Sequence, residues 1–294
     1  HGADGIGLFR TEVLFMQPGD LPDEEEQFTQ YRSVLEAMRG RPVTIRTVDI
    51  GGDKLSSLME AGEEANPILG WRAIRYCISH PQVLETQLRA LLRASVYGEL
   101  QIMFPMISGI EELNLLLDIL DAVRASLLSE GYAVAEDVPA GIMVEVPSAA
   151  MTADILAHRS RFFSVGTNDL IQYTIAVDRS NERIAYLYQP FHPAILRTVQ
   201  QIVMHGHRAG IPVAMCGEMA GDPVSAVVLL GLGLDELSMS AFTIPEVKRI
   251  IRAVRLQEAE ELVGRLLDLR SWREVTDAVQ SFLGSRLDAD VLQA

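Results

Sequence analysis

The sequence predicts an α/β fold in which a parallel sheet closes into a barrel. Short apolar segments alternate with longer segments of helical periodicity along nearly the whole chain, which indicates consecutive parallel strands joined by helices. Polar and ionisable residues stand at the C-terminal ends of the apolar segments, where such barrels build their active sites. We therefore expect a (β/α)8 barrel of the TIM type, with extra helices at its C-terminal end.

Seven strands are predicted from apolar runs bounded by Gly, Pro or Asp. Their near-continuous apolar character indicates a sheet that is covered on both faces. They lie at residues 5–9, 42–50, 100–106, 140–146, 162–166, 212–217 and 234–240. Because a barrel of this type has eight strands, we expect its first strand to precede residue 1 and interpret the chain as a fragment of a longer protein.

The helices that join these strands are predicted from apolar residues at helical spacing, and several end on a glycine that suits a C-cap. They lie at residues 24–40, 80–95, 109–131 and 192–210. Beyond residue 254, two further amphipathic segments at 256–269 and 272–287 are expected to be packing helices without chemistry. We expect a single domain over 1–294, with the barrel ending near residue 254.

Composition excludes several classes of function. A chain of 294 residues with 48% hydrophobic residues can bury a sizeable core. Its net charge of −15 argues against nucleic-acid binding, which needs a basic face. Its apolar runs are shorter than the roughly 20 residues of a membrane helix. We predict a soluble, cytoplasmic protein that binds neither nucleic acid nor membrane.

Two carboxylates, Glu145 and Asp169, follow neighbouring predicted strands. They could be ordinary buried acids paired with arginine. Two carboxylates facing one barrel mouth also fit Mg²⁺, which keeps open positions for water and substrate oxygens. We favour the metal because barrel rims are where such sites occur.

Arginines at the same rim point to an anion. Arg10 and Arg46 follow apolar strands, where a charge is costly unless it is paired, and a bound phosphate or carboxylate would supply the partner. Arg179 lies just past Asn168 and Asp169 in the chain and could be a third arginine that binds the anion. Two further cations, Arg72 and Lys54, are weaker candidates, since they could equally be exposed to solvent.

The two cysteines are too few for a disulfide framework, and their spacing matches no zinc motif. Cys216 stands between an apolar strand and a glycine, and could be either an inert buried thiol or a proton donor. Cys77 lies in a predicted helix and is interpreted as core. None of the six histidines stands at a strand end with the carboxylates, so no histidine is assigned to chemistry.

The motifs in chain order carry a family resemblance. They read GADGIGLFRTEVLFM, RTVDIGGDK, NPILGWRAIR, IMFPMI, GIMVEVPSA, SVGTNDLIQYTIAVDR, LYQPFHPA, MCGEMAGDP and GLGLDELSMS. Over nearly the whole chain they resemble the phosphoenolpyruvate-binding C-terminal domain of enzyme I of the bacterial sugar phosphotransferase system, the phosphoenolpyruvate-protein phosphotransferases. Pyruvate phosphate dikinases and phosphoenolpyruvate synthases share the barrel and the CGE element, but RTVDIGGDK and TNDLIQYTIAVDR look like enzyme I.

The resemblance implies a role for each residue at the rim. Glu145 and Asp169 would bind Mg²⁺, and Cys216 would protonate the enolate carbon to yield pyruvate. Phosphoenolpyruvate would be held by Arg10, Arg46, Asn168, Asp169 and Arg179. The resemblance implies a transferase and a homodimer.

One departure from the family pattern limits what this chain can do. In the family the phosphoryl acceptor is a histidine in a Thr-Ser-His context on a separate N-terminal domain, and this chain has no such context. The carrier protein HPr also docks on that domain. We expect the chain to bind phosphoenolpyruvate and Mg²⁺ without completing transfer alone.

Two other functions stay open. The chain could be a metal-dependent lyase that makes or consumes pyruvate enolate, although this gives no reason for several phosphate-directed arginines. It could also be a non-catalytic sensor or dimerisation module, as in a regulatory nitrogen-related branch of enzyme I.

Overall fold

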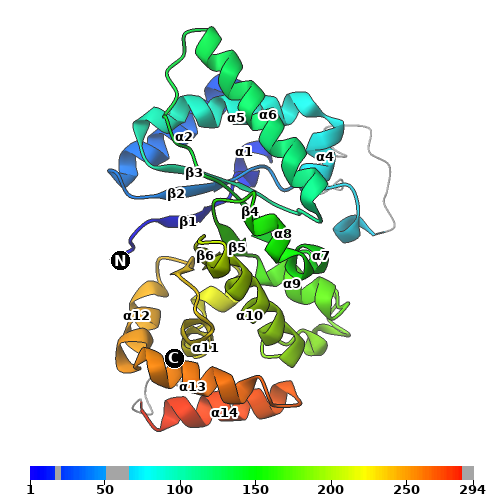
Figure 1. The fold of residues 1–294 in the computed structure, drawn as a ribbon, viewed down its shortest axis with the longest axis vertical. Coiled ribbons are helices and arrows are strands. Elements are labelled where there is room, and N and C mark those ends of the chain that lie inside the picture. Colours follow the sequence, from blue (N-terminus) through cyan, green and yellow to red (C-terminus); the bar gives the residue numbers. More distant parts are fainter. Residues whose placement is uncertain (17–20, 51–65, 287–294) are drawn as a thin grey trace. The chain divides into compact units, whose positions relative to one another are not determined.

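The fold is an α/β barrel of the TIM type, described from a computed structural model that covers residues 1–16, 21–50 and 66–286 (Figure 1). In this part of the chain, seven strands form a sheet whose order follows the sequence from β1 to β7. Every pair with a defined register is parallel. The seven predicted strands are confirmed, and the strand expected before residue 1 stays a prediction.

Two compact units make up the chain. The N-terminal unit is Asp4–Met143, and the C-terminal unit is Val144–Ala294 together with His1–Ala3. Strand β4 ends at the first residue of the C-terminal unit. A single domain over 1–294 remains our proposal.

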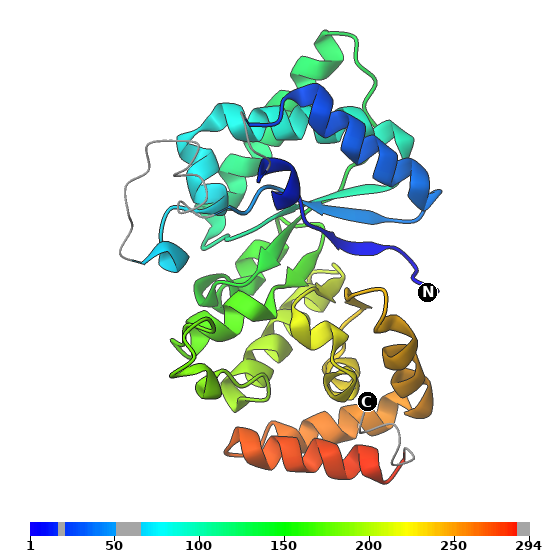
Figure 2. The same cartoon turned by 180° about the vertical axis from the view of Figure 1, so that it is seen from behind.

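The N-terminal unit contains four strands, and long helices pack beside them. The strands are β1 (Ile6–Phe9), β2 (Val43–Arg46), β3 (Leu100–Phe104) and β4 (Ala140–Val144). The helices are α1 (Glu12–Phe15), α2 (Glu24–Met38), α4 (Ala73–Ser79), α5 (Pro81–Ala94) and α6 (Ile110–Ser129). Figure 2 shows α2 and α5 side by side, and the core between them includes the fully buried Tyr31, Leu84 and Leu88.

Local sequence explains where these helices begin. Asp23 caps α2 by accepting a hydrogen bond from the backbone N–H of Glu26, whose carboxylate accepts from the N–H of Asp23, so two otherwise unpaired donors are satisfied. Helix α5 begins at Pro81, whose missing N–H costs nothing in the first turn.

The C-terminal unit holds the remaining strands, β5 (Phe163–Val165), β6 (Val213–Met215) and β7 (Glu236–Leu237). Its helices are α7 (Pro147–Met151), α8 (Ala153–Ala157), α9 (Thr167–Thr174), α10 (Pro193–Arg208), α11 (Pro223–Leu232), α12 (Ile244–Ala253), α13 (Leu256–Leu266) and α14 (Trp272–Gly284). The expected C-terminal packing helices are thus confirmed as α13 and α14. None of the helices in the described ranges is long and apolar enough to cross a membrane.

Close packing in this unit depends on glycine. A Cβ atom at Gly231 of α11 would lie 2.2 Å from the carbonyl oxygen of Ala259 in α13, so the two helices approach over a position that has no side chain. Strands β5 and β6 pair in register, Phe163 opposite Val213 and Val165 opposite Met215, and all four residues are buried. Their C-terminal ends therefore lie next to each other.

Candidate functional site

Asn168 and Glu218 meet at the C-terminal ends of β5 and β6. Asn168 stands in the first turn of α9, directly after β5, and Glu218 follows β6. The Nδ2 of Asn168 donates to Oε1 of Glu218 at 3.1 Å, and the backbone N–H of Glu218 donates to Oδ1 of Asn168 at 2.8 Å. The predicted substrate ligand Asn168 is thus held by a residue 50 positions later in the chain.

Arg179 lies beside the same carboxylate. Its Nη1 is 3.5 Å from Oε1 of Glu218, and its backbone N–H donates to Oε1 of Gln172 at 3.0 Å. The Arg179 side chain is 45% exposed, so its guanidinium faces solvent on one side. Arg179 and Asn168 thus share one partner, Oε1 of Glu218, and their role as two ligands of one anion stays a prediction.

Tyr188 completes this group. Its hydroxyl donates to the carbonyl oxygen of Asn168 at 3.3 Å. Burial raises the pKa of Tyr188 to about 12, opposed by the positive charge of Arg179 and increased by the carboxylates of Glu218 and Asp169. The phenol therefore stays protonated and remains a hydrogen-bond donor near neutral pH.

Glu145 and Asp169 are buried carboxylates at neighbouring strand ends. Glu145 directly follows β4 and is 2% exposed, and Asp169 in the first turn of α9 is 8% exposed. The backbone N–H of Gly166 donates to the carbonyl oxygen of Val144 at 3.1 Å, which ties together the two segments that carry them.

The donor chemistry of these two carboxylates fits Mg²⁺, which prefers oxygen ligands and keeps several waters. No cluster of three or more His, Cys, Asp or Glu side chains suited to a metal occurs in the described ranges. A metal at this site would therefore take its other ligands from water and substrate, as Mg²⁺ does in phosphate chemistry.

Cys216 is buried directly after β6. It is 8% exposed, and its Sγ lies 3.7 Å from the carbonyl oxygen of Val165, while its backbone N–H donates to the same oxygen at 3.1 Å. The next residue, Gly217, has room for no side chain, because a Cβ there would lie 1.8 Å from Oγ1 of Thr167. The thiol is thus held at the C-terminal end of β5, in the same unit as Asn168.

In the N-terminal unit, Arg46 is enclosed by acids. Its Nη2 is 2.7 Å from Oε1 of Glu12, and its Nη1 is 2.9 Å from Oδ2 of Asp49. Arg72 donates two hydrogen bonds to the carboxylate of the same Asp49, from Nε at 3.0 Å and from Nη2 at 2.9 Å. The solvent-exposed interpretation of Arg72 is therefore wrong. The chain itself supplies the partner of Arg46, so the burial of this arginine does not by itself demand a bound anion.

A buried polar residue, Gln87, forms hydrogen bonds to the backbone just after Arg46 and to Thr11. Its Oε1 accepts from the N–H of Val48 at 2.8 Å, and its Nε2 donates to Oγ1 of Thr11 at 3.3 Å. Thr11 in turn donates to the carbonyl oxygen of Arg46 at 3.0 Å. Because Gln87 and Thr11 are both fully buried, this network restrains the strand end from which Arg46 projects.

Arg10 differs from Arg46. It directly follows β1 but is exposed, and within the described residues its side chain forms no hydrogen bond or ion pair. Its surroundings therefore do not show the partner that a charge after an apolar strand was expected to need, and its role as a ligand of the anion stays a prediction. Lys54 lies outside the described residues.

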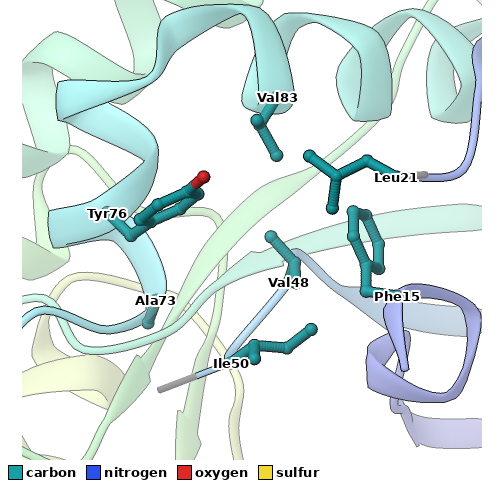
Figure 3. A pocket seen from close by; sticks show the side chains of 7 residues that line it. All are labelled: Phe15, Leu21, Val48, Ile50, Ala73, Tyr76 and Val83. Carbon is teal, nitrogen blue, oxygen red and sulfur yellow. The ribbon is translucent and has the colours of Figure 1, made fainter. Parts of the chain in front are cut away.

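A small pocket in the N-terminal unit is lined by apolar residues, some of which neighbour Asp49 and Arg72 in the chain. Figure 3 shows the seven side chains that line it, Phe15, Leu21, Val48, Ile50, Ala73, Tyr76 and Val83. Its lining contains no charged group, so it offers nothing that would neutralise a phosphate.

The sequence reasoning missed three residues of these clusters. Glu12, Gln87 and Tyr188 were given no role, although Glu12 and Tyr188 stand inside the motifs quoted above. Glu12 could have been considered from the sequence, because it follows Arg10, a predicted ligand of the anion, by two positions. No such signal was present for Gln87, which lies in an ordinary amphipathic helix.

Comparisons with known proteins agree with the motifs. The family described as "PEP-utilising enzyme, PEP-binding domain" matches residues 1–256. A phosphoenolpyruvate-protein phosphotransferase of Staphylococcus carnosus (strain TM300) is 53% identical over 282 residues, covering 96% of this chain and 49% of the relative. One of Priestia megaterium is 52% identical over 281 residues, with the same coverage. The chain thus spans about half the length of these relatives.

A solved structure shares the fold. A citrate lyase of Burkholderia xenovorans LB400 matches with a TM-score of 0.52 at 16% identity, covering 94% of this chain and 83% of that one. At this identity the likeness is one of fold alone.

Proposed function

Because the chain belongs to the family of the phosphoenolpyruvate-binding domain of PEP-utilising enzymes, we propose that it is the substrate-binding barrel of a phosphoenolpyruvate-protein phosphotransferase. The observation that carries the proposal is the grouping of Asn168 and Arg179 at strand ends of one unit that also holds two buried carboxylates, Glu145 and Asp169. Donors for an anion and oxygen ligands for a cation are what a phosphoenolpyruvate–Mg²⁺ complex requires.

Binding and orientation are the first task of these residues. Arg179 and Asn168 offer N–H donors to the substrate oxygens, and Arg10 and Arg46 are proposed to add positive charge. Neutralising and orienting the phosphoryl group is most of what phosphoryl transfer asks of a protein. Mg²⁺ held by Glu145 and Asp169 would neutralise negative charge on the enolate and carboxylate oxygens.

The proposed reaction breaks the bond between phosphorus and the enol oxygen, and the phosphoryl group passes to a histidine nitrogen that is not in this chain. The enolate that remains takes a proton at its methylene carbon from the thiol of Cys216, which gives pyruvate. The thiolate would recover its proton from solvent. From that histidine the phosphoryl group would go on to HPr and support sugar uptake.

The first experiment is titration of phosphoenolpyruvate into the chain by calorimetry, with and without Mg²⁺. Arg179→Ala is the test variant, because its half-exposed side chain can be removed without opening the core. Arg183→Ala is the matched control, since it removes an exposed arginine four residues later that forms no side-chain hydrogen bond or ion pair among the described residues. We expect Mg²⁺-dependent binding that Arg179→Ala weakens at least about tenfold and Arg183→Ala leaves unchanged.

Absence of binding by a chain that circular dichroism shows to be folded would contradict the proposal. If binding is found, adding the histidine-bearing domain should produce pyruvate, whereas the chain alone should not. Sedimentation would then test the proposed homodimer.

A further inference from the structure

Glu218 has contacts that its exposure does not explain. Its side chain is 78% exposed, so burial does not force it against any neighbour, and as an ordinary surface acid it would be free to rotate. Instead, one oxygen, Oε1, meets both the amide of Asn168 and the guanidinium of Arg179. These are the two side chains that the proposed function assigns to the substrate in this unit.

The contacts determine how the Asn168 amide is turned. The backbone N–H of Glu218 can only donate, so Asn168 must direct its carbonyl oxygen toward it, at 2.8 Å. The carboxylate of Glu218 can only accept, so it takes one hydrogen of Nδ2, at 3.1 Å. Both ends of the amide are thus engaged by one residue, and the second hydrogen of Nδ2 is left for another acceptor.

Arg179 is restrained by the same oxygen. Its backbone is anchored by Gln172, and its Nη1 lies 3.5 Å from Oε1 of Glu218. A guanidinium has five N–H groups, so one contact leaves most of its donors available. A flexible arginine that is already oriented loses less conformational entropy when it binds an anion.

We infer that Glu218 is a positioning residue that orients the Asn168 amide and the Arg179 guanidinium toward the substrate. The inference rests on the proposed function. Glu218 does not touch the substrate, and it acts through the two side chains that do.

A double-mutant cycle tests the inference through phosphoenolpyruvate affinity in the presence of Mg²⁺. Glu218→Ala is expected to weaken binding about fivefold to tenfold, the effect of one lost charge-assisted hydrogen bond at an exposed site. In an Asn168→Ala background the same change should have a smaller effect, because one of the two side chains that Glu218 positions is gone and only Arg179 remains. Glu218→Gln should recover most of the affinity, since its amide oxygen still accepts from Nδ2.

The control is Glu260→Ala, which removes an exposed glutamate of α13 that has no side-chain partner among the described residues. A Glu218→Ala variant that binds as well as the wild type, or more tightly, would overturn the inference. So would an undiminished effect in the Asn168→Ala background.

A second measurement needs no substrate. In the ligand-free chain, the NMR side-chain signals of the Asn168 amide should shift and exchange faster with solvent in Glu218→Ala but not in Glu260→Ala. If the wild type binds no phosphoenolpyruvate, the proposed function fails, and this signal still decides whether Glu218 positions Asn168.

Discussion

At the scale of single residues, Arg46 and Arg10 share a predicted role but differ in their surroundings. Arg46 lies between two acids, Glu12 and Asp49, and its side chain is 11% exposed. Arg10 is exposed and forms no side-chain hydrogen bond or ion pair within the described part of the chain. The same change to alanine should therefore have different consequences for stability.

Arg46→Ala should lower the free energy of unfolding by about 2–3 kcal/mol, because it removes the arginine that pairs with two largely buried carboxylates, Glu12 and Asp49. Arg10→Ala should change it by less than about 0.5 kcal/mol. Both variants should bind phosphoenolpyruvate more weakly. Urea unfolding followed by circular dichroism gives the free energies, and equal stability of the two variants would show that the acids do not depend on Arg46.

The two cysteines should differ in reactivity. Burial raises the pKa of Cys77 to about 12, and the negative charge of Asp49 adds to the effect, so this thiol stays protonated in mildly alkaline solution. Cys77 is 1% exposed and Cys216 8%. We expect iodoacetamide to modify only Cys216 in the folded chain, and phosphoenolpyruvate with Mg²⁺ to slow the reaction.

Mass spectrometry of peptides identifies the modified cysteine. Cys216→Ser is the control and should leave the folded chain unlabelled. Modification of Cys77 before unfolding would contradict the prediction.

At the scale of elements, the approach of the segment after β6 to the start of α9 depends on Gly217. Its backbone angles are open to any residue, so the requirement comes from the Thr167 atoms that a side chain would meet. Gly217→Ala should therefore force the two segments apart, with a loss of stability and of phosphoenolpyruvate binding.

Gly264→Ala is the matched control for Gly217→Ala. Gly264 lies inside α13, and a Cβ atom there would meet nothing within 4 Å. The change should raise stability by up to about 1 kcal/mol, because alanine favours helix. Thermal unfolding of both variants gives the comparison, and a Gly217→Ala chain as stable as the wild type would show that the contact relaxes without cost.

Three helices of the N-terminal unit are joined by Arg89. This arginine of α5 pairs with Glu24 at the start of α2 and with Glu130 at the end of α6. Hydrogen bonds from Arg89 and Ser126 lower the pKa of Glu130 from 4.5 to about 2.

Because the folded chain keeps the Glu130 carboxylate charged where the unfolded chain protonates it, this contribution to stability is complete above pH 4.5. It is lost as the pH falls toward about 2. Glu130→Gln should therefore lose less stability than the wild type over that interval. Urea unfolding at both ends of the interval measures the difference, and identical losses would show that the pair is screened by solvent.

At the scale of the whole molecule, the open question is whether the two compact units behave as one domain. We propose one barrel domain over 1–294, which predicts a single calorimetric unfolding transition. Phosphoenolpyruvate with Mg²⁺ should raise its midpoint, since a ligand that binds only the folded state stabilises it. Two separate transitions would show that Asp4–Met143 and Val144–Ala294 unfold independently.

The sequence by itself determined the strands, the six helices predicted above and the residue types at the strand ends. These depend on local features: apolar runs, helical spacing, Asp23 before α2 and Pro81 at the start of α5. The family also follows from the sequence, because its motifs recur in order along the chain.

Only the tertiary structure decided which side chains meet. Glu12 and Arg46 are separated by 34 positions, and Asn168 and Glu218 by 50. No local pattern indicates such a pair. Within its own segment, each of these polar side chains could form its hydrogen bonds with water as well as with its distant partner. Burial of Asp49 and the approach of the residues after β6 to α9 bring these groups together, and both depend on how distant segments pack.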